Sequence, residues 1–294
     1  MKKISLTIFA TLLLNNICFS QIEIDKTKST LTGKTGILTE TYPETILDHF
    51  NIGFYNYFKG SDEGGNNAKG TYNSVSIEAE LEGLDNKLAQ EITDEAYAYY
   101  IEKWKSKGLN VKCPTPSEIE ATKQFVKDKG KGKAELINSG VYQEGNAYAK
   151  YLRVLPTNAA QVKKEYYGNF VYGNAQFFPT DFQGNVSSVN FHFDLNFISF
   201  RNGFGTNASI KGTTGLKSSS GGSIVLWAKT KNLAASYTNE CVGGTDFYDT
   251  FDKGSKWVVK INKEKYKSLA LQMIKKSIDD QFAEYDKDLA KAKD

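Results

Sequence analysis

The clearest pattern along the chain is the strict alternation of apolar and polar residues in VNFHFDLNF, residues 189–197. Successive side chains of a β-strand point to opposite faces of its sheet, so a period of two predicts a strand with one dry face. The opposite face carries His192 and Asp194, flanked by Asn190 and Asn196. We interpret the stretch as a structural strand whose second face is merely polar. The face expected in the core comprises Val189, Phe191, Phe193, Leu195 and Phe197.

The same period of two recurs from about residue 134 onward, between turns rich in Gly, Asn and Ser. KSSSGG, residues 217–222, has the composition of a hairpin connection between two of these strands. Earlier in the chain, SVSIEAELEG at 74–83 alternates in the same way and predicts a half-buried strand. Further strands are predicted at 109–114, 134–142, 149–156, 169–178, 188–200, 208–216, 222–229 and 256–261.

A longer period predicts three helices. Residues 85–107 repeat an apolar residue at every fourth position, and Gly108 ends this helix. A Ser-x-x-Glu capping box precedes a second helix at 118–128. Asn262 begins a long helix at 263–292. Its apolar stripe comprises Tyr266, Leu269, Ala270, Met273, Ile274, Ile278, Phe282, Tyr285 and Leu289.

Together these elements predict an α+β fold with a mixed, mainly antiparallel sheet and helices packed on one face. The fold is expected to have a β-α-β-α start and a long C-terminal helix. Residues 21–73 show no clear period, so we expect an irregular segment whose aromatic residues dock on the core. No linker rich in Pro or Ser divides the remainder, so we expect residues 74–294 to form one domain.

Residues 1–20 have the parts of a secretory signal peptide. Two lysines precede a short apolar run, and the small residues Cys18 and Ser20 stand before Gln21. The run is shorter than the roughly 20 residues that a membrane-spanning helix needs. We therefore expect cleavage after Ser20 and export to the periplasm or the outer membrane. No later segment is apolar enough to predict a transmembrane helix.

The charge of the chain limits the partners that we expect, and its cysteine content limits the disulfides. The chain has 37 basic and 34 acidic residues, whereas nucleic-acid-binding proteins usually carry a concentrated basic face. We therefore expect no nucleic-acid partner. Cys113 and Cys241 remain after cleavage, and in an oxidising compartment they have one possible intramolecular connectivity. The sequence is compatible with a disulfide between them and with two buried thiols.

No complete catalytic motif occurs in the sequence, because GxSxG, HExxH, CxxC and SxxK are all absent. His192 and Asp194 are the candidates for a metal-binding pair, or for a base and the carboxylate that orients it. A Cys–His pair with either cysteine is a further alternative. The polar row that extends beyond both residues is typical of the solvent-facing side of a sheet. We therefore predict no catalytic residue and no cofactor.

The order of the elements resembles the CsgG/TolB-N-terminal-like fold of periplasmic envelope-assembly proteins. SVSIEAELEG would be its first strand and 85–107 its helix, with LNVKCP and SEIEATKQF as the next strand and helix. KAELINSGVY resembles its strand ending in glycine, 189–216 its antiparallel pair, and 263–292 its closing helix. The lipidated cysteine and the Asp-Thr-Gly turn of that fold are missing. The resemblance implies an envelope-associated protein and assigns no functional residue.

Three functions remain as hypotheses. The first is an exported, non-enzymatic envelope protein that binds or assembles with an envelope protein or ligand. The second is a secreted hydrolase that uses His192, Asp194 or a cysteine. The third is a membrane-inserting protein with a β-hairpin at 189–228, since about ten alternating residues per strand are enough to span a bilayer. We expect the first, because export is indicated and no catalytic motif is present.

Overall fold

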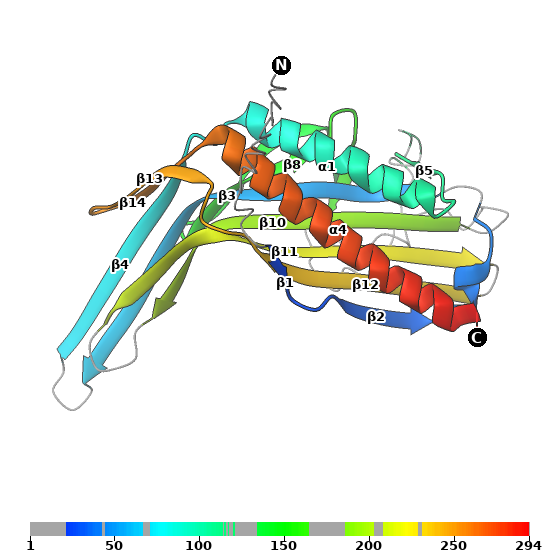
Figure 1. The fold of residues 1–294 in the computed structure, drawn as a ribbon, viewed down its shortest axis with the longest axis horizontal. Coiled ribbons are helices and arrows are strands. Elements are labelled where there is room, and N and C mark those ends of the chain that lie inside the picture. The colour runs from blue at the N-terminus through cyan, green and yellow to red at the C-terminus, as the bar shows by residue number, and fades with distance from the viewer. Residues whose placement is uncertain are drawn as a thin grey trace, which may run out of the picture.

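The computed structural model describes residues 22–42, 45–66, 71–113, 115, 117, 120, 134–164, 186–202, 208–228 and 231–293. Strands dominate these residues. They form a mixed sheet of 12 strands that does not close on itself, and the described residues contain two α-helices. Figure 1 shows both helices crossing the same face of this sheet.

The main path of the sheet runs through eight strands. In spatial order they are β1 (Glu23–Ile24), β12 (Lys231–Val242), β11 (Ile210–Ala228), β10 (Val186–Asn202), β3 (Thr45–Asn66), β4 (Thr71–Glu82), β14 (Trp257–Ile261) and β13 (Tyr248–Lys253). The strands that join it from the side are β2 (Lys28–Gly33), β5 (Val111–Lys112), β7 (Gly140–Gly145) and β8 (Ala149–Leu155). A separate pair is formed by β6 (Ala134–Ile137) and β9 (Gln161–Lys164). The helices are α1 (Asn86–Ser106), α4 (Lys263–Lys293) and the short 3₁₀ helix η1 (Thr35–Thr39).

β3 is the strand at which the sheet divides. Its first half pairs in parallel with β10, from Thr45 to Phe54, and its second half pairs antiparallel with β4, from Tyr57 to Asn66. Both partners use the same edge of β3, because β8 holds the opposite edge as far as Phe58. Beyond this point β10 and β11 leave the plane of β3 and β4. The β3–β4 hairpin then projects away from the helices (Figure 1).

The two diverging hairpins, β3–β4 and β10–β11, stay in contact through their inner faces. A Cβ atom at Gly60 would lie 2.9 Å from the ring of Phe200, so glycine lets that ring rest on the β3 backbone. Asp62 of β3 accepts a hydrogen bond of 2.9 Å from the backbone N–H of Ser209. Phe200 also packs on Trp257 of β14, with 5.8 Å between ring centroids. The projecting part of the molecule is therefore a two-layered arm.

The apolar face of β10 lies in the core beneath the helices, as its alternation predicts. Phe50 of β3 stacks on Phe191 with 5.3 Å between ring centroids. The same ring contacts Tyr97 and Tyr100 of α1, each at 5.4 Å. The apolar residues of this face, each at most 1% exposed, are Val189, Phe191, Phe193, Leu195 and Phe197.

α1 and α4 run side by side in the same direction, and ion pairs align them. α4 supplies the lysines in the first half of the contact, and α1 supplies them in the second half. The pairs are Lys263–Asp85 (2.5 Å), Lys267–Glu91 (3.0 Å), Lys275–Glu95 (2.8 Å), Lys103–Asp279 (2.5 Å) and Lys107–Asp286 (2.6 Å). Solvent-exposed pairs contribute about 0–1 kcal/mol each, so they fix the register of the helices more than they stabilise the fold.

The helices predicted at 85–107 and 263–292 are confirmed as α1 and α4. Asn262 caps α4, as expected, by accepting a hydrogen bond of 3.1 Å from a backbone N–H of the first turn. The helix predicted at 118–128 lies largely outside the described residues, and the strand predicted at 169–178 lies entirely outside them.

The predicted fold class is wrong. Within the described residues, β1, β2, η1, β3 and β4 all precede α1, so no β-α-β-α succession opens the fold, and 52% of the structure is strand. Residues 45–66, expected to be irregular, form the long strand β3. Irregularities in its pairing at 47–49 and at 55–57 hide this strand, because each one shifts the alternation of apolar and polar residues. An open mixed sheet with two helices replaces the predicted α+β arrangement.

The predicted hairpin connection at 217–222 is also wrong, because these residues lie inside β11. Ser220 belongs to a buried hydrogen-bond network beneath α4: it donates to Asn239 Oδ1 at 2.6 Å and accepts from Gln281 Nε2 at 2.9 Å. Gly222 leaves space for the same glutamine, since a Cβ atom there would collide with Gln281 Oε1. The small residues of this stretch therefore make room for α4 and do not form a turn.

Removing a ring from the apolar face of β10 should strongly destabilise the fold. We expect Phe193→Ala to lower the free energy of unfolding by about 3–5 kcal/mol, because it leaves a cavity at a fully buried position. Tyr148→Ala is the matched control, since Tyr148 is 60% exposed and its loss should change that free energy by less than about 0.5 kcal/mol. Urea unfolding followed by circular dichroism measures both. Equal effects of the two variants would contradict the assignment of this face to the core.

Candidate functional site

The face of the sheet opposite the helices carries a cluster of polar side chains from three neighbouring strands. β3 turns Phe50 and Phe54 toward the helices, so its alternate residues lie on the other face. The register places the residues of β8 and β10 beside them, because Gly53 of β3 pairs with Arg153 on one side and with Asp194 on the other. The polar cluster, as we call it, comprises His49, Asn51, Arg153, His192 and Asp194.

Arg153 is the centre of the polar cluster. Its Nη1 donates hydrogen bonds to Asp194 Oδ1 at 2.8 Å and to Asn51 Oδ1 at 2.9 Å, and its Nε lies 3.7 Å from Glu144 Oε2. The side chain is only 17% exposed. Burial lowers the pKa of Arg153, but the Asp194 carboxylate and the Tyr151 hydroxyl together outweigh burial, so the net shift is upward. The guanidinium therefore stays charged and holds three strands together at this point.

Gly53 makes this ion pair possible. The side chains of Arg153 and Asp194 meet across the backbone of β3 at Gly53. A Cβ atom there would lie 2.9 Å from Arg153 Nη1 and would collide with Asp194 Oδ1. Gly53 does not have a positive φ angle, so glycine is needed here for space and not for its backbone conformation.

His192 lies flat across the neighbouring strand β11. A Cβ atom at Gly221 would lie 3.0 Å from His192 Nε2, so this glycine provides the space for the ring. The pKa of His192 is lowered from 6.5 to about 4, first by burial and then by His49 and Arg153. His49 is 8% exposed, and its Nδ1 lies 3.5 Å from Asp48 Oδ2. The face expected to be merely polar is thus partly buried, and His192 is neutral at pH 7.

The two candidate residues, His192 and Asp194, share this face of the sheet. Asp194 bonds to Arg153, so this carboxylate is engaged by a cation from another strand. Among the described residues, no group of three or more His, Cys, Asp or Glu side chains is placed to hold a metal ion. Sequence reasoning missed His49, Asn51 and Arg153 as neighbours of His192. One available signal was that Arg153 is one of only two arginines in the chain.

A stack of planar side chains continues from the polar cluster toward the arm. Phe58 and Tyr55 of β3 are stacked with 5.1 Å between ring centroids, and Tyr55 lies 4.7 Å from Tyr151 of β8. The guanidinium of Arg153 lies over the ring of Tyr151 at 4.7 Å. The stack connects the polar cluster to the point at which β3 exchanges β10 for β4.

Cys113 and Cys241 are free and are not bonded to each other. β11, β10 and β3 lie between β12, which carries Cys241, and β5, which precedes Cys113. At the usual strand spacing this is roughly 19 Å, whereas a disulfide needs Cα atoms within about 7 Å. Cys113 contacts Tyr97 of α1 at 3.3 Å, and Cys241 belongs to the core beneath α4. Both cysteines therefore lie on the helix side of the sheet and both histidines on the opposite side, which excludes a Cys–His pair.

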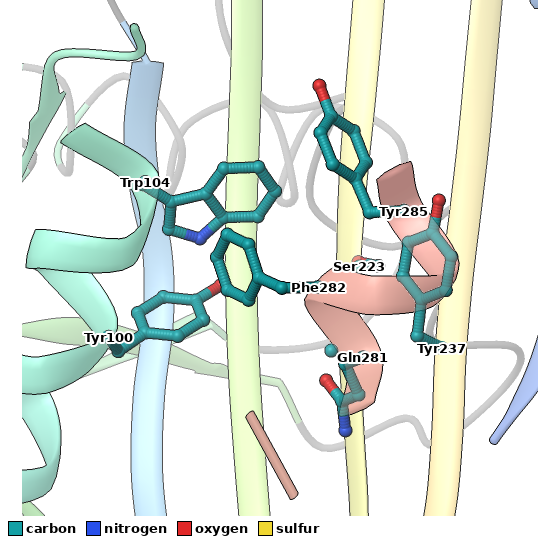
Figure 2. Close-up of a pocket in the computed structure, with 8 residues that line it drawn as sticks. Tyr100, Trp104, Ser223, Tyr237, Gln281, Phe282 and Tyr285 are labelled. Atoms are coloured by element: carbon teal, nitrogen blue, oxygen red, sulfur yellow. The ribbon is translucent and has the colours of Figure 1, made fainter. Parts of the chain in front are cut away.

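The helix side has a small pocket between α1, α4 and the sheet (Figure 2). Trp104 and Tyr100 come from α1, Phe282 and Tyr285 from α4, and Tyr237 from β12. Its volume of about 10 Å³ holds no more than one water molecule. This interface is a packed aromatic layer and offers no room for an organic ligand.

Comparison with protein families, with curated proteins and with solved structures gives no match to this chain. The resemblance to the CsgG/TolB-N-terminal-like fold therefore remains a prediction. Among the described residues, no helix has the length and apolar character needed to cross a membrane.

Filling the space at Gly53 should disrupt the polar cluster. We expect Gly53→Ala to lower the free energy of unfolding by about 1–3 kcal/mol, because the added methyl group forces Arg153 and Asp194 apart. Gly36→Ala is the control, since a Cβ atom at Gly36 meets nothing within 4 Å. The midpoint of urea unfolding should shift for the first variant only. A Gly53→Ala protein as stable as the parent would show that the ion pair does not depend on this glycine.

The two cysteines should differ in reactivity. Burial raises the pKa of Cys241 to about 12, which leaves little of the reactive thiolate at neutral pH. Cys113 is partly exposed. In the native protein at pH 7.5, we expect iodoacetamide to modify Cys113 at least tenfold faster than Cys241, as measured by peptide mass spectrometry. Modification of both at equal rates in urea is the control, and equal rates in the native protein would contradict the burial of Cys241.

Proposed function

We propose that this protein is an exported, non-enzymatic component of the cell envelope that binds a partner protein by accepting a strand on the outer edge of β4. The apolar N-terminal run and the small residues before Gln21 support export. The observation that carries the binding proposal is the open, uncharged edge of the projecting β3–β4 hairpin.

The edge of β4 is open over most of its length in the described structure. β4 pairs with β3 from Thr71 to Glu80, and β14 joins its other edge only from Ala79 onward. Among the described strands, none pairs with that outer edge between Thr71 and Glu78. Within the described residues, the backbone N–H and C=O groups that point outward there have no strand partner, and an unpaired edge of this kind can pair with another chain.

The open part of β4 lacks the charged residues and prolines that usually prevent an edge strand from pairing with another chain. Thr71–Ile77 contains no charged residue and no proline, and it includes the strand-favouring residues Thr, Tyr, Val and Ile. The edge strand β13 differs, because three of its six residues are Asp249, Asp252 and Lys253, and its pairing with β14 is irregular. Charged residues thus protect the outer edge of β13, whereas Thr71–Ile77 of β4 has no such protection.

The addition of a peptide strand to an exposed sheet edge is a known form of peptide recognition, and we infer that β4 uses it. Main-chain hydrogen bonds supply affinity, and the side chains that alternate along the added strand supply specificity. An exported chain meets envelope proteins, so we infer that the partner is an extended segment of one of them. The same unprotected edge would otherwise make the protein prone to aggregation.

The alternative functions have less support. A hydrolase that uses Cys113 or Cys241 with a histidine is disfavoured, because the sheet separates the cysteines from the histidines. A membrane-inserting hairpin at 189–228 would have to remove the apolar face of β10 from its contacts with the core. Neither alternative is supported by a contact of the kind that it requires.

Charges on the open edge should abolish partner binding and leave the fold intact. Ser74 and Ser76 of β4 are exposed, and Ser74→Lys with Ser76→Lys introduces repulsion and the steric bulk that protects natural edges. The matched control is Thr250→Lys with Ser255→Lys, which places the same charge at exposed positions on and beside β13. In envelope extracts of the cell of origin, chemical cross-linking should give a high-mass complex for the parent and the control, and only the free chain for the β4 variant.

Two results would contradict the proposal. One is a parent protein that cross-links to no other protein in the envelope fraction. The other is a β4 variant that melts at the parent's temperature and still forms the complex, since the edge would then be irrelevant to binding.

A further inference from the structure

The outer face of the β10–β11 hairpin is cationic where this hairpin forms one layer of the arm. Phe200 packs on Trp257 of β14, and Gly212 leaves space for the same ring, so both positions face the other layer. Their neighbours Arg201 and Lys211 therefore point outward, because successive side chains of a strand alternate between its faces. Both are exposed, and they stand directly opposite each other in the pairing of β10 with β11.

A third cation, Lys217 of β11, lies on the same face. Its Nζ donates a hydrogen bond of 3.3 Å to Ser199 Oγ. Ser199 stands opposite Thr213 and is separated from Arg201 by one residue. Within the described part of the chain, no carboxylate pairs with any of the three cations. The cationic face, as we call it, comprises Arg201, Lys211 and Lys217 with the hydroxyl groups of Ser199 and Thr213.

The like charges of Arg201 and Lys211 are unfavourable for the fold by themselves, because two cations directly opposite on neighbouring strands repel each other. Lysines elsewhere have partners: on the other layer of the arm, Lys59 of β3 lies 3.3 Å from Glu78 of β4. The five lysines at the contact between α1 and α4 are paired as well. The unpaired charges of the cationic face are therefore available to an anionic partner outside the chain.

The carboxylates near the cationic face leave its outer part without neutralisation. Asp194 of β10 is bound by Arg153. Glu240 of β12 stands opposite Ser219, nearer the helix-covered part of the sheet. Asp62 lies on the inner face of β3 and accepts a backbone hydrogen bond there. The outward positions closer to the tip of the β10–β11 hairpin thus keep their positive charge.

We propose that the cationic face docks the arm on an anionic phospholipid surface. Ammonium and guanidinium groups only donate hydrogen bonds, and they bind phosphate oxygens strongly because the bonds are charge-assisted. The cations stand on an exposed sheet face at the projecting end of the molecule (Figure 1), and such a face suits a plane of many phosphate groups. The negative potential of an anionic bilayer attracts basic residues that lie near it. The inference is independent of a partner at β4, because β4 belongs to the other layer of the arm.

Co-sedimentation of the full chain with lipid vesicles tests the proposal. Vesicles of equal parts phosphatidylglycerol and phosphatidylcholine supply the anionic surface, and vesicles of phosphatidylcholine alone supply a neutral one. At low ionic strength we expect the parent to bind the anionic vesicles at least tenfold more tightly than the neutral ones, and added salt should remove the difference. Arg201→Gln with Lys211→Gln and Lys217→Gln should lower the affinity for anionic vesicles about 100-fold, since each basic residue contributes about fivefold.

Two further variants separate this face from general charge effects. Lys34→Gln with Lys87→Gln and Lys231→Gln removes the same charge from exposed positions elsewhere and should bind as the parent does. Arg201→Lys with Lys211→Arg keeps both charges and should also bind as the parent does. All these positions are exposed, so every variant should melt at or near the parent's temperature. The apolar N-terminal run is identical in all proteins compared.

Each other outcome overturns the proposal. A parent that binds both kinds of vesicle equally has no preference for anionic lipid. Equal loss of binding in the two triple variants would show that net charge acts and not this face. If inorganic phosphate displaces the parent from anionic vesicles and chloride of the same ionic strength does not, the cations form a site for a single phosphate group and not a surface for a bilayer.

Discussion

The structure depends on one constraint in β3, the exchange of β10 for β4 on the same edge of the strand. Hydrogen-bonding groups on that edge serve a parallel partner as far as Phe54 and an antiparallel partner from Tyr57 onward. Since one edge cannot hold two strands at once, β10 has to leave the plane there. This single exchange creates the helix-covered sheet, the projecting hairpin and the two-layered arm. Among the described strands, β14 is the neighbour on the outer edge of β4, and it pairs there only from Ala79 onward.

Glycine provides the space that this arrangement needs at several positions. Gly60 admits the Phe200 ring between the two hairpins, and Gly53 admits the Arg153–Asp194 ion pair on the polar face. Gly221 and Gly222 admit His192 on one face of β11 and Gln281 of α4 on the other. Glycine in a strand costs conformational entropy and contributes no packing of its own. Its use at these positions indicates that close approach of side chains to the backbone is the more important requirement.

The sequence predicts the elements with an unbroken period and fails where the period shifts or where distant strands meet. The period is unbroken in α1, in α4 and in β10 as far as Phe197, and the sequence predicts all three elements. β3 was missed because irregular pairing near His49 and near Asn56 changes the phase of its alternation twice. The polar cluster was missed for a different reason: its members come from β3, β8 and β10, and their proximity is set by strand order and register. No local pattern around His192 contains that information.

The polar cluster and the exposed hairpin are connected through the same strand. Arg153 joins β8, β3 and β10 just before β3 changes partner, and the stack of Tyr151, Tyr55 and Phe58 leads from this guanidinium to the beginning of the hairpin. The charge of the cluster therefore bears on the stretch of β3 where β10 departs. Because β10 and β11 form one layer of the arm, any change in that departure alters the support beneath β3 and β4. The buried ion pair, which contributes little to stability on balance, thus serves to fix the geometry of the divided sheet.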